Sequence, residues 1–321
     1  MDNNIEKISN INTENINIVT VSDDNYSQHL GVMLFSLLDN SKYNNLKNIY
    51  IIDSNISQVN RTKLKDTVQK FDAKIFFKQI NNEKYKNFKV SSHISLATYY
   101  RISIPEILNS SIKKVIYLDC DLIVKNDINK LWQTDISEYC IGAVENPIFN
   151  RQNELGMPLN STYFNSGVMI INLEKWRKES ISDKVVNYLK ENKVKILLWD
   201  QDGLNAILFD KWKPLHPKWN LQTKFFKMNY NKMNFKYQEY LESNKNPSII
   251  HYTGSSKPWQ YLNKHPLKNE YYKYLKRTCW KKYIPKDKNI KNVSKMFVKK
   301  YFPTKAIAVL KIILRSLHIN Y

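Results

Sequence analysis

Two aspartates separated by one residue give the strongest chemical signal in the sequence. Asp119 and Asp121 flank Cys120, directly after the apolar run 115–118 and before the apolar run 122–124. The repulsion between two carboxylates this close raises the pKa of one of them and destabilises the folded state, unless a positive charge lies between them. Carboxylate oxygens suit Mg²⁺ or Mn²⁺. The pair therefore indicates a divalent-cation site at the end of a strand, although this spacing also occurs by chance in loops.

A histidine near residue 250 is a candidate third ligand. His251 comes near the end of the apolar run 248–252 and is followed by Gly254 and Lys257. A lone histidine is more often a hydrogen-bonded structural residue than a metal ligand. If His251 joins the two aspartates, the set of two oxygens and one nitrogen favours Mn²⁺ over Mg²⁺, because imidazole is the softer donor. Lys257 can neutralise a nearby phosphate as a point charge.

The elements that must position these residues alternate along the chain. The expected strands of the first part are 17–21, 49–52 and 75–77, and the expected helices are 30–38 and 57–70. Strands that alternate with helices predict a parallel sheet flanked by helices. Ligands bind beyond the carboxyl ends of such strands. This rule places Asp23, Asp24 and Asn25, which follow the first strand, at a ligand-binding edge.

The second part of the chain continues this α/β pattern. Further strands are expected at 115–118, 122–124, 141–144, 167–172 and 248–252, with one helix over 173–191 and an irregular, aromatic and lysine-rich region over 220–246. The sequence contains no internal repeat and no linker rich in proline or glycine. It therefore predicts one domain over residues 1–280 and a basic C-terminal tail over 281–321.

Positive charge is concentrated in that tail. The chain has 50 Lys and Arg against 29 Asp and Glu, a net charge of +21, and residues 271–321 hold 14 of the bases but only one acid. The chain is therefore not a uniformly basic nucleic-acid coat. Residues 304–318 have the pattern of an amphipathic helix, which can lie on an anionic membrane. Each basic residue near the membrane surface adds about 1 kcal/mol to the binding free energy. The alternatives are a helix packed on its own domain and, less favoured, a nucleic-acid-binding segment.

The N-terminus and the cysteines bear on the compartment. The first residues are polar and show no secretory signal, and no run reaches the roughly 18 apolar residues of a spanning helix. The three cysteines, Cys120, Cys140 and Cys279, form no Cys-x-x-Cys pair, which favours a reducing compartment. We expect a cytoplasmic protein, peripheral on the inner face of the membrane, without nucleic acid as a partner.

Six segments that occur in a fixed order carry a family resemblance. They are 22–26, 118–121, 163–168, 171–176, 200–202 and 251–259. Together they resemble glycosyltransferase family 8, most closely its bacterial lipopolysaccharide and lipooligosaccharide hexosyltransferases, over about residues 16–280. The resemblance implies the GT-A fold, a mixed and mostly parallel sheet flanked by helices. It also implies a UDP-hexose donor and retention of the anomeric configuration.

The resemblance assigns roles to the residues that bind the nucleotide. Asp23 and Asn25 match positions that hold the uridine, and Asp119, Asp121 and His251 match the metal set.

Further positions match residues around the diphosphate and the donor sugar. Lys257, with Gly254 allowing close backbone approach, matches the diphosphate contact, and Arg101 matches a residue near the diphosphate and the sugar. Asn165 and Asp200 match donor-sugar contacts, and Asp200 is also a candidate catalytic residue.

The residue expected beneath the anomeric carbon bears on the mechanism. Gln201 occupies that position, and an amide is a poor nucleophile, whereas retention ordinarily uses a carboxylate nucleophile in two displacements. We therefore favour attack by the acceptor hydroxyl on the face that the phosphate leaves. Asp202 is the alternative nucleophile, or a residue that orients the site.

Glu145 departs from the family pattern, which often has Asp there.

The sequence therefore predicts a metal-dependent, retaining hexosyltransferase that moves galactose or glucose from a UDP-sugar to a cell-envelope glycan, such as lipooligosaccharide, anchored in lipid. One alternative is a UDP-glucosyltransferase that acts on a protein-linked glycan. The other is a non-catalytic polybasic protein that binds membrane or nucleic acid.

Overall fold

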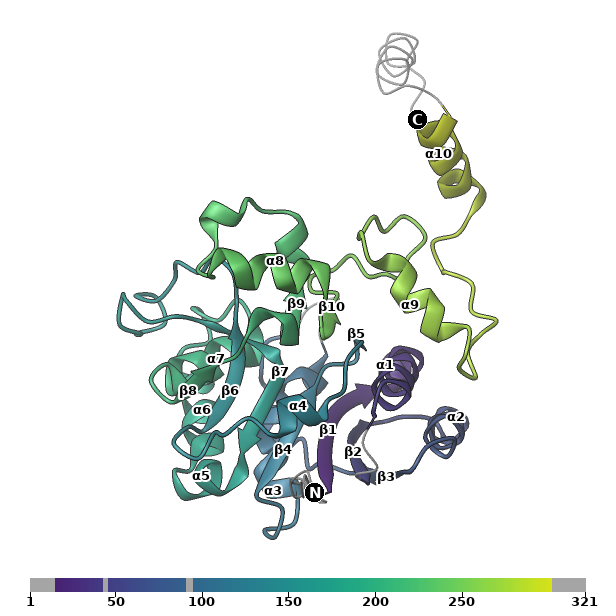
Figure 1. The fold of residues 1–321 in the computed structure, drawn as a ribbon. Helices are drawn as coiled ribbons and strands as arrows, with labels where there is room; N and C mark the ends of the chain where they lie inside the picture. Colours follow the sequence, from purple (N-terminus) through teal and green to yellow (C-terminus); the bar gives the residue numbers. More distant parts are fainter. Residues whose placement is uncertain (1–14, 43–45, 91–94, 302–321) are drawn as a thin grey trace, which may run out of the picture.

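A seven-stranded sheet forms the centre of the molecule (Figure 1). The computed structural model describes residues 15–42, 46–90 and 95–301. In spatial order the strands are β3 (Ala73–Lys78), β2 (Lys47–Ser54), β1 (Ile16–Asp23), β4 (Lys114–Leu118), β7 (Phe164–Asn172), β6 (Ile141–Glu145) and β8 (Trp212–Pro214). Only β7 runs opposite to the other six strands, because it is antiparallel to both β4 and β6. The mixed, mostly parallel α/β sheet expected from the sequence is confirmed.

Helices cover both faces of this sheet, and alternating apolar side chains explain why. In β1, Ile16 and Ile18 face the core beneath α1 (Ser27–Asp39) and α2 (Gln58–Val68). Val19 and Val21 face the opposite core, as expected when successive side chains of a strand point to opposite faces. That second core also contains apolar side chains of α6 (Ile181–Glu191) and α7 (Trp199–Leu208).

A small second sheet brings distant parts of the chain together. It contains β5 (Leu122–Val124), β10 (Ile249–His251) and β9 (Leu221–Gln222), with β10 antiparallel to β5 and parallel to β9. The register pairs His251 with Leu122, the residue directly after Asp121. This pairing fixes the histidine beside the two aspartates, although about 130 residues separate them in the sequence.

Two expectations about local structure need correction. The helix expected over 173–191 is two helices, α5 (Leu173–Lys178) and α6, because Ser180 adopts a left-handed backbone with φ of 51°. The region 220–246 is less irregular than expected, since it contains β9 and α8 (Tyr237–Lys245). Two further short helices, α3 (Ile104–Ile107) and α4 (Asn129–Trp132), precede these segments in the chain.

The C-terminal part begins on the body of the protein and then leaves it. On α9 (Lys268–Leu275), the Tyr271 hydroxyl lies 2.7 Å from Nδ1 of His29 in α1. Further along, the carboxylate of Asp287 accepts hydrogen bonds from the backbone N–H groups of Tyr261 and Leu262. Helix α10 (Ile290–Tyr301) then extends away from the sheet (Figure 1). The helix expected at 304–318 lies outside the described residues, and no helix within the described part is long and apolar enough to cross a membrane.

Candidate active site

A cavity of about 880 Å³ opens at the carboxyl ends of β1 and β4. Of the residues singled out from the sequence, those that line it are Asp23, Asn25, Arg101, Asp119, Asp121, Asn165, Asp200, Gln201, His251, Gly254 and Lys257. The location agrees with the rule that ligands bind beyond the carboxyl ends of parallel strands.

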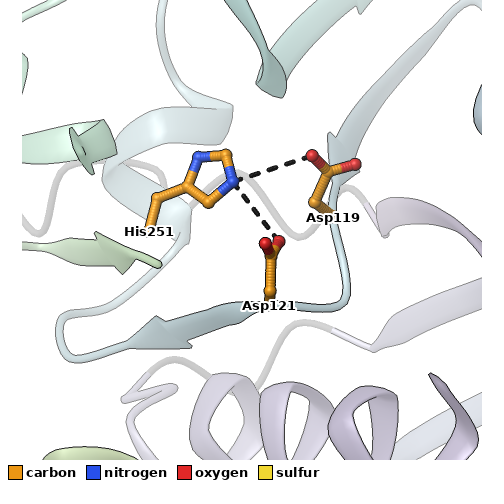
Figure 2. A group of neighbouring side chains, drawn as sticks. All are labelled: Asp119, Asp121 and His251. Atoms are coloured by element: carbon orange, nitrogen blue, oxygen red, sulfur yellow. Dashed lines mark ion pairs between the residues drawn. The ribbon is translucent and has the colours of Figure 1, made fainter. Parts of the chain in front are cut away.

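Asp119, Asp121 and His251, which line this cavity, point toward one another (Figure 2). Nε2 of the histidine lies 3.7 Å from Oδ2 of Asp119 and 3.3 Å from Oδ1 of Asp121. One potential ligand atom from each side chain lies within 4.8 Å of the other two. The three side chains could therefore hold one metal ion, as the sequence led us to expect.

Gly167 on β7 leaves the space that this convergence requires. A Cβ atom at this position would lie 2.3 Å from Cε1 of His251 and 2.6 Å from Oδ2 of Asp119. The backbone carbonyl of Gly167 also accepts a hydrogen bond of 2.9 Å from the N–H of Asp119. The backbone of β7 therefore supports the first aspartate and leaves no room for a side chain beside the imidazole.

Lys257 neutralises the second aspartate in this structure. Its ammonium group is hydrogen-bonded to Oδ2 of Asp121 and to the carbonyl of Tyr252, the latter at 2.8 Å. Burial raises the pKa of Asp121, but the charge of Lys257 and the neighbouring His251 more than offset this effect and hold the pKa well below its usual range. The ammonium group therefore lies beside the candidate metal ligands, where a phosphate group would also be attracted.

Arg101 is buried between two carboxylates and is not a surface residue. Its Nη2 lies 3.1 Å from Oδ1 of Asp119, and its Nε lies 3.0 Å from Oδ2 of Asp200. Burial raises the pKa of Asp200 to about 6, although Arg101 and a 2.9 Å hydrogen bond from Thr98 oppose the shift. The guanidinium also lies 4.6 Å from the centre of the Tyr117 ring. Arg101 thus links the Asp119 side of the site to the Asp200 side.

The amide of Gln201 is held in one orientation. Its Oε1 accepts hydrogen bonds from Nδ2 of Asn165 at 3.1 Å and from the backbone N–H of Ser166 at 3.0 Å. Its Nε2 donates to the hydroxyl of Tyr163 at 3.3 Å. The oxygen that faces the protein is therefore already occupied by donors.

Asp202 lies behind the cavity and does not line it. Its Oδ1 accepts from the Tyr163 hydroxyl at 2.7 Å, and its Oδ2 accepts from the backbone N–H groups of Leu197 and Leu198 at 2.8 and 2.9 Å. The side chain has no exposed surface and also pairs with Arg151 at 3.4 Å. Of the two interpretations made from the sequence, this geometry favours a residue that orients the site over a nucleophile.

The residues expected to bind the nucleotide follow the first strand and the last. Oδ1 of Asp23 accepts a hydrogen bond of 3.0 Å from the N–H of Tyr26. Asp24 points elsewhere, because its carboxylate accepts from the N–H of Ser57 at the start of α2. Gly254 has φ of 90°, a backbone conformation that disfavours any side chain.

The family follows from a match that spans most of the chain. Residues 17–263 match the family model described as Glycosyl transferase family 8. The chain belongs to this family. It is therefore a glycosyltransferase, as the six motifs indicated.

The chain is similar to several individual members of this family. It is 42% identical over 272 residues to General stress protein A of Bacillus subtilis, which covers 83% of this chain and 95% of that protein. It is 27% identical over 289 residues to lipopolysaccharide 1,2-glucosyltransferase of Escherichia coli K12, covering 88% and 84% of the two chains. The crystal structure of galactosyltransferase LgtC with donor and acceptor sugar analogues superposes with a TM-score of 0.74 at 24% identity, covering 85% of this chain and 98% of the other. That similarity shows the shared fold.

Two residues that join the parts of this family 8 site were not found from the sequence. Asn220 is fully buried and lies between His251 and Asn165, at 2.9 and 2.8 Å. Tyr163 lies between Gln201 and Asp202. The sequence offered no signal for Asn220, because it falls in the region expected to be irregular. Tyr163 stands in a recognised motif, but nothing there indicated what its hydroxyl contacts.

Proposed function

We propose that this glycosyltransferase is metal-dependent and retaining, and that it transfers galactose or glucose from a UDP-sugar to a cell-envelope glycan such as lipooligosaccharide. The observation that carries the proposal is the convergence of Asp119, Asp121 and His251, which line the cavity, beside Lys257. The relative named lipopolysaccharide 1,2-glucosyltransferase supports this class of donor and acceptor.

The residues present fit a divalent cation. Two carboxylates and one imidazole nitrogen face one another, and only a glycine is tolerated beside them at position 167. This donor set suits Mn²⁺, with Mg²⁺ as the second candidate. When bound, such a cation supplies Lewis-acid stabilisation of the negative charge that develops on the diphosphate. Lys257 contributes a fixed positive charge to the same end.

The other cavity residues divide between the nucleotide and the sugar. We assign Asp23 and Asn25, beyond the first strand, to the uridine. Gly254, with its positive φ, lets the backbone approach the diphosphate close to Lys257. For the hexose we assign Asn165 and Asp200.

Arg101 has a supporting position in this scheme. It is held between Asp119 and Asp200, and so lies between the diphosphate side and the sugar side of the site. We expect it to fix the distance between them.

Same-face attack accounts best for the placement of the side chains. Gln201 is an amide whose oxygen already accepts from Asn165 and Ser166. Asp200 is paired with Arg101, and Asp202 lies behind the cavity. The acceptor hydroxyl therefore attacks the anomeric carbon on the face from which UDP departs. The bond from that carbon to the phosphate oxygen breaks, and this oxygen takes the proton of the hydroxyl.

The test is UDP release from a panel of UDP-sugars with Mn²⁺. We expect release from UDP-galactose or UDP-glucose, and its loss in Asp119→Ala and Asp121→Ala. Asp39→Ala is the matched control, because Asp39 pairs with Arg277 on the surface and does not line the cavity. Absence of release from every donor by folded protein would contradict the proposal, and so would a glycosyl group trapped on Asp202 during turnover.

We also propose that the C-terminal tail attaches the enzyme to the inner, cytoplasmic surface of an anionic membrane, where a lipid-linked acceptor is found. Helix α10 extends from the body (Figure 1), and Ile290 and Val293 on it are 88% and 41% exposed. Lys291 and Lys295 lie on the same helix.

Sedimentation with anionic vesicles tests the attachment with two truncations. One truncated variant ends at Tyr301 and lacks only the segment after α10. The other ends at Lys288 and lacks α10 as well. We expect a stepwise loss of binding. Unchanged sedimentation of the shorter chain would mean that the tail does not attach the protein.

A further inference from the structure

A continuous chain of hydrogen bonds connects the imidazole of His251 to the carboxylate of Asp202 at the far side of the site. In order, it passes through His251, Asn220, Asn165, Gln201, Tyr163 and Asp202, with distances of 2.9, 2.8, 3.1, 3.3 and 2.7 Å. All of these side chains except that of Gln201 are buried.

Elementary donor and acceptor chemistry fixes the direction of this chain. Oδ2 of Asp202 already accepts from two backbone N–H groups, and its Oδ1 accepts from the hydroxyl of Tyr163. The Tyr163 oxygen then accepts from Nε2 of Gln201. The donor and the acceptor of an amide are different atoms of the same group. Because Nε2 of Gln201 donates to Tyr163, its Oε1 is the atom that accepts a hydrogen bond from Nδ2 of Asn165.

Two backbone N–H groups fix the same orientation independently. The N–H of Ser166 lies 3.0 Å from Oε1 of Gln201, and the N–H of Gly167 lies 3.1 Å from Oδ1 of Asn165. A backbone N–H cannot change its role, so both amides must present oxygen to it. Oδ1 of Asn165 then accepts Nδ2 of Asn220.

The last step concerns the imidazole. With its NH₂ group directed to Asn165, Asn220 presents Oδ1 to Nδ1 of His251, which must therefore carry the proton. In the neutral imidazole, Nε2 is then the nitrogen with the lone pair, and it is the nitrogen that faces Asp119 and Asp121. A histidine that ligates a metal needs this arrangement, in which the other ring nitrogen donates to a fixed oxygen.

We infer that Asn220 is a positioning residue that sets the tautomer of His251 for cation binding and links it to the amides of Asn165 and Gln201. This inference rests on the proposed function, in which His251 is a metal ligand. Asn220 is fully buried and touches the two sides of the site with different halves of one amide. Its two roles can therefore be separated by substitution.

Two variants make that separation. Asn220→Ala removes both halves of the amide, and we expect Mn²⁺ binding to weaken about 10-fold to 100-fold. Asn220→Asp keeps an oxygen for Nδ1 of His251 but places a carboxylate against Oδ1 of Asn165. We expect this variant to bind Mn²⁺ at least as tightly as the unsubstituted protein, while kcat for UDP release falls because Asn165 must turn away.

The measurements are Mn²⁺ affinity without donor, by titration calorimetry, and UDP-release kinetics of the full chain. Asn40→Ala is the matched control. It removes hydrogen bonds to Ser36, Val124 and Tyr274, away from the cavity, and should lower stability with Mn²⁺ affinity unchanged. Long-range ¹H–¹⁵N NMR of the unsubstituted protein reports the tautomer directly, so the inference stays testable even if Asn220→Ala does not fold.

The outcomes distinguish a failure of the proposed function from a failure of the role proposed for Asn220. If the unsubstituted protein neither binds Mn²⁺ nor releases UDP from any donor, the proposed function fails. If it does both, three results would each overturn the role of Asn220. These are a neutral His251 that carries its proton on Nε2, unchanged Mn²⁺ affinity in Asn220→Ala, or weakened Mn²⁺ affinity in Asn220→Asp.

Discussion

A single methyl group at Gly167 should disable the candidate metal site with a moderate effect on folding. In Gly167→Ala the new Cβ would lie 2.3 Å from Cε1 of His251 and 2.6 Å from Oδ2 of Asp119. Carbon atoms in contact are about 3.5–4.0 Å apart, so the ring must move by about 1 Å or more. The strand cannot yield instead without moving Asp119, whose N–H is bound to the Gly167 carbonyl.

The expected magnitudes differ for stability and activity. Overpacking of this kind costs about 1–3 kcal/mol of unfolding free energy. A misplacement of about 1 Å in an active site can reduce the rate about 100-fold. We therefore expect Gly167→Ala to fold, to bind Mn²⁺ much more weakly and to lose most UDP release, measured by urea denaturation, calorimetry and steady-state kinetics.

Gly142→Ala is the control for overpacking alone. On β6, a Cβ at position 142 would lie 2.8 Å from Cγ2 of Ile170 and 3.3 Å from side-chain atoms of Ile136 and Leu215. These neighbours are apolar core residues outside the cavity. The control should therefore lose stability but keep its Mn²⁺ affinity. Equal Mn²⁺ affinity in Gly167→Ala and the unsubstituted protein would refute the steric reasoning.

Three further substitutions test the electrostatics and the hydrogen bonds. Because burial raises the pKa of Asp200 to about 6, the folded protein holds a proton that the unfolded chain releases near pH 4, and stability falls as the pH rises between these values by up to about 3 kcal/mol. Asp200→Asn should remove this slope, which parallel urea titrations of variant and parent from pH 4 to pH 7 would measure; an unchanged slope in the variant would show that the slope has another origin. Arg101→Met leaves two carboxylates without their buried cation and should destabilise by about 3–5 kcal/mol in chemical denaturation; a loss below that of a surface substitution would contradict the burial of the pair. Tyr163→Phe removes the hydroxyl between Gln201 and Asp202 and should cost about 1–3 kcal/mol of stability, with Mn²⁺ affinity unchanged because backbone N–H groups still orient the amides, so a large loss of affinity would count against that account.

The strands and the metal-ligand candidates were predictable because their signals are local. The apolar runs before Asp119 and before His251 identify buried strands, and the pair of aspartates lies within three residues. The break of the helix at Ser180 was not predictable from periodicity, since the apolar pattern continues across a residue with positive φ. Asn220 could not be identified either. Its importance comes from contacts with residues 31 and 55 positions away, which only the folded chain brings together.

The tail is a mixed case. Its charge was evident from composition, and α10 lies within it, but the helix expected at 304–318 lies outside the described residues. The boundary between domain and tail stays a prediction.

The structure also changes the physical reason for the pair of aspartates. From the sequence, two carboxylates so close together demanded a positive charge between them. In the folded chain each carboxylate has a cation of its own on its outer side. Arg101 pairs with Asp119, and Lys257 pairs with Asp121. The protein thus offsets their repulsion with residues supplied by distant segments, and the oxygens that face His251 stay directed toward one another. Folding alone therefore does not require a metal ion here; the reason to expect one is that three ligand atoms converge beside the cavity.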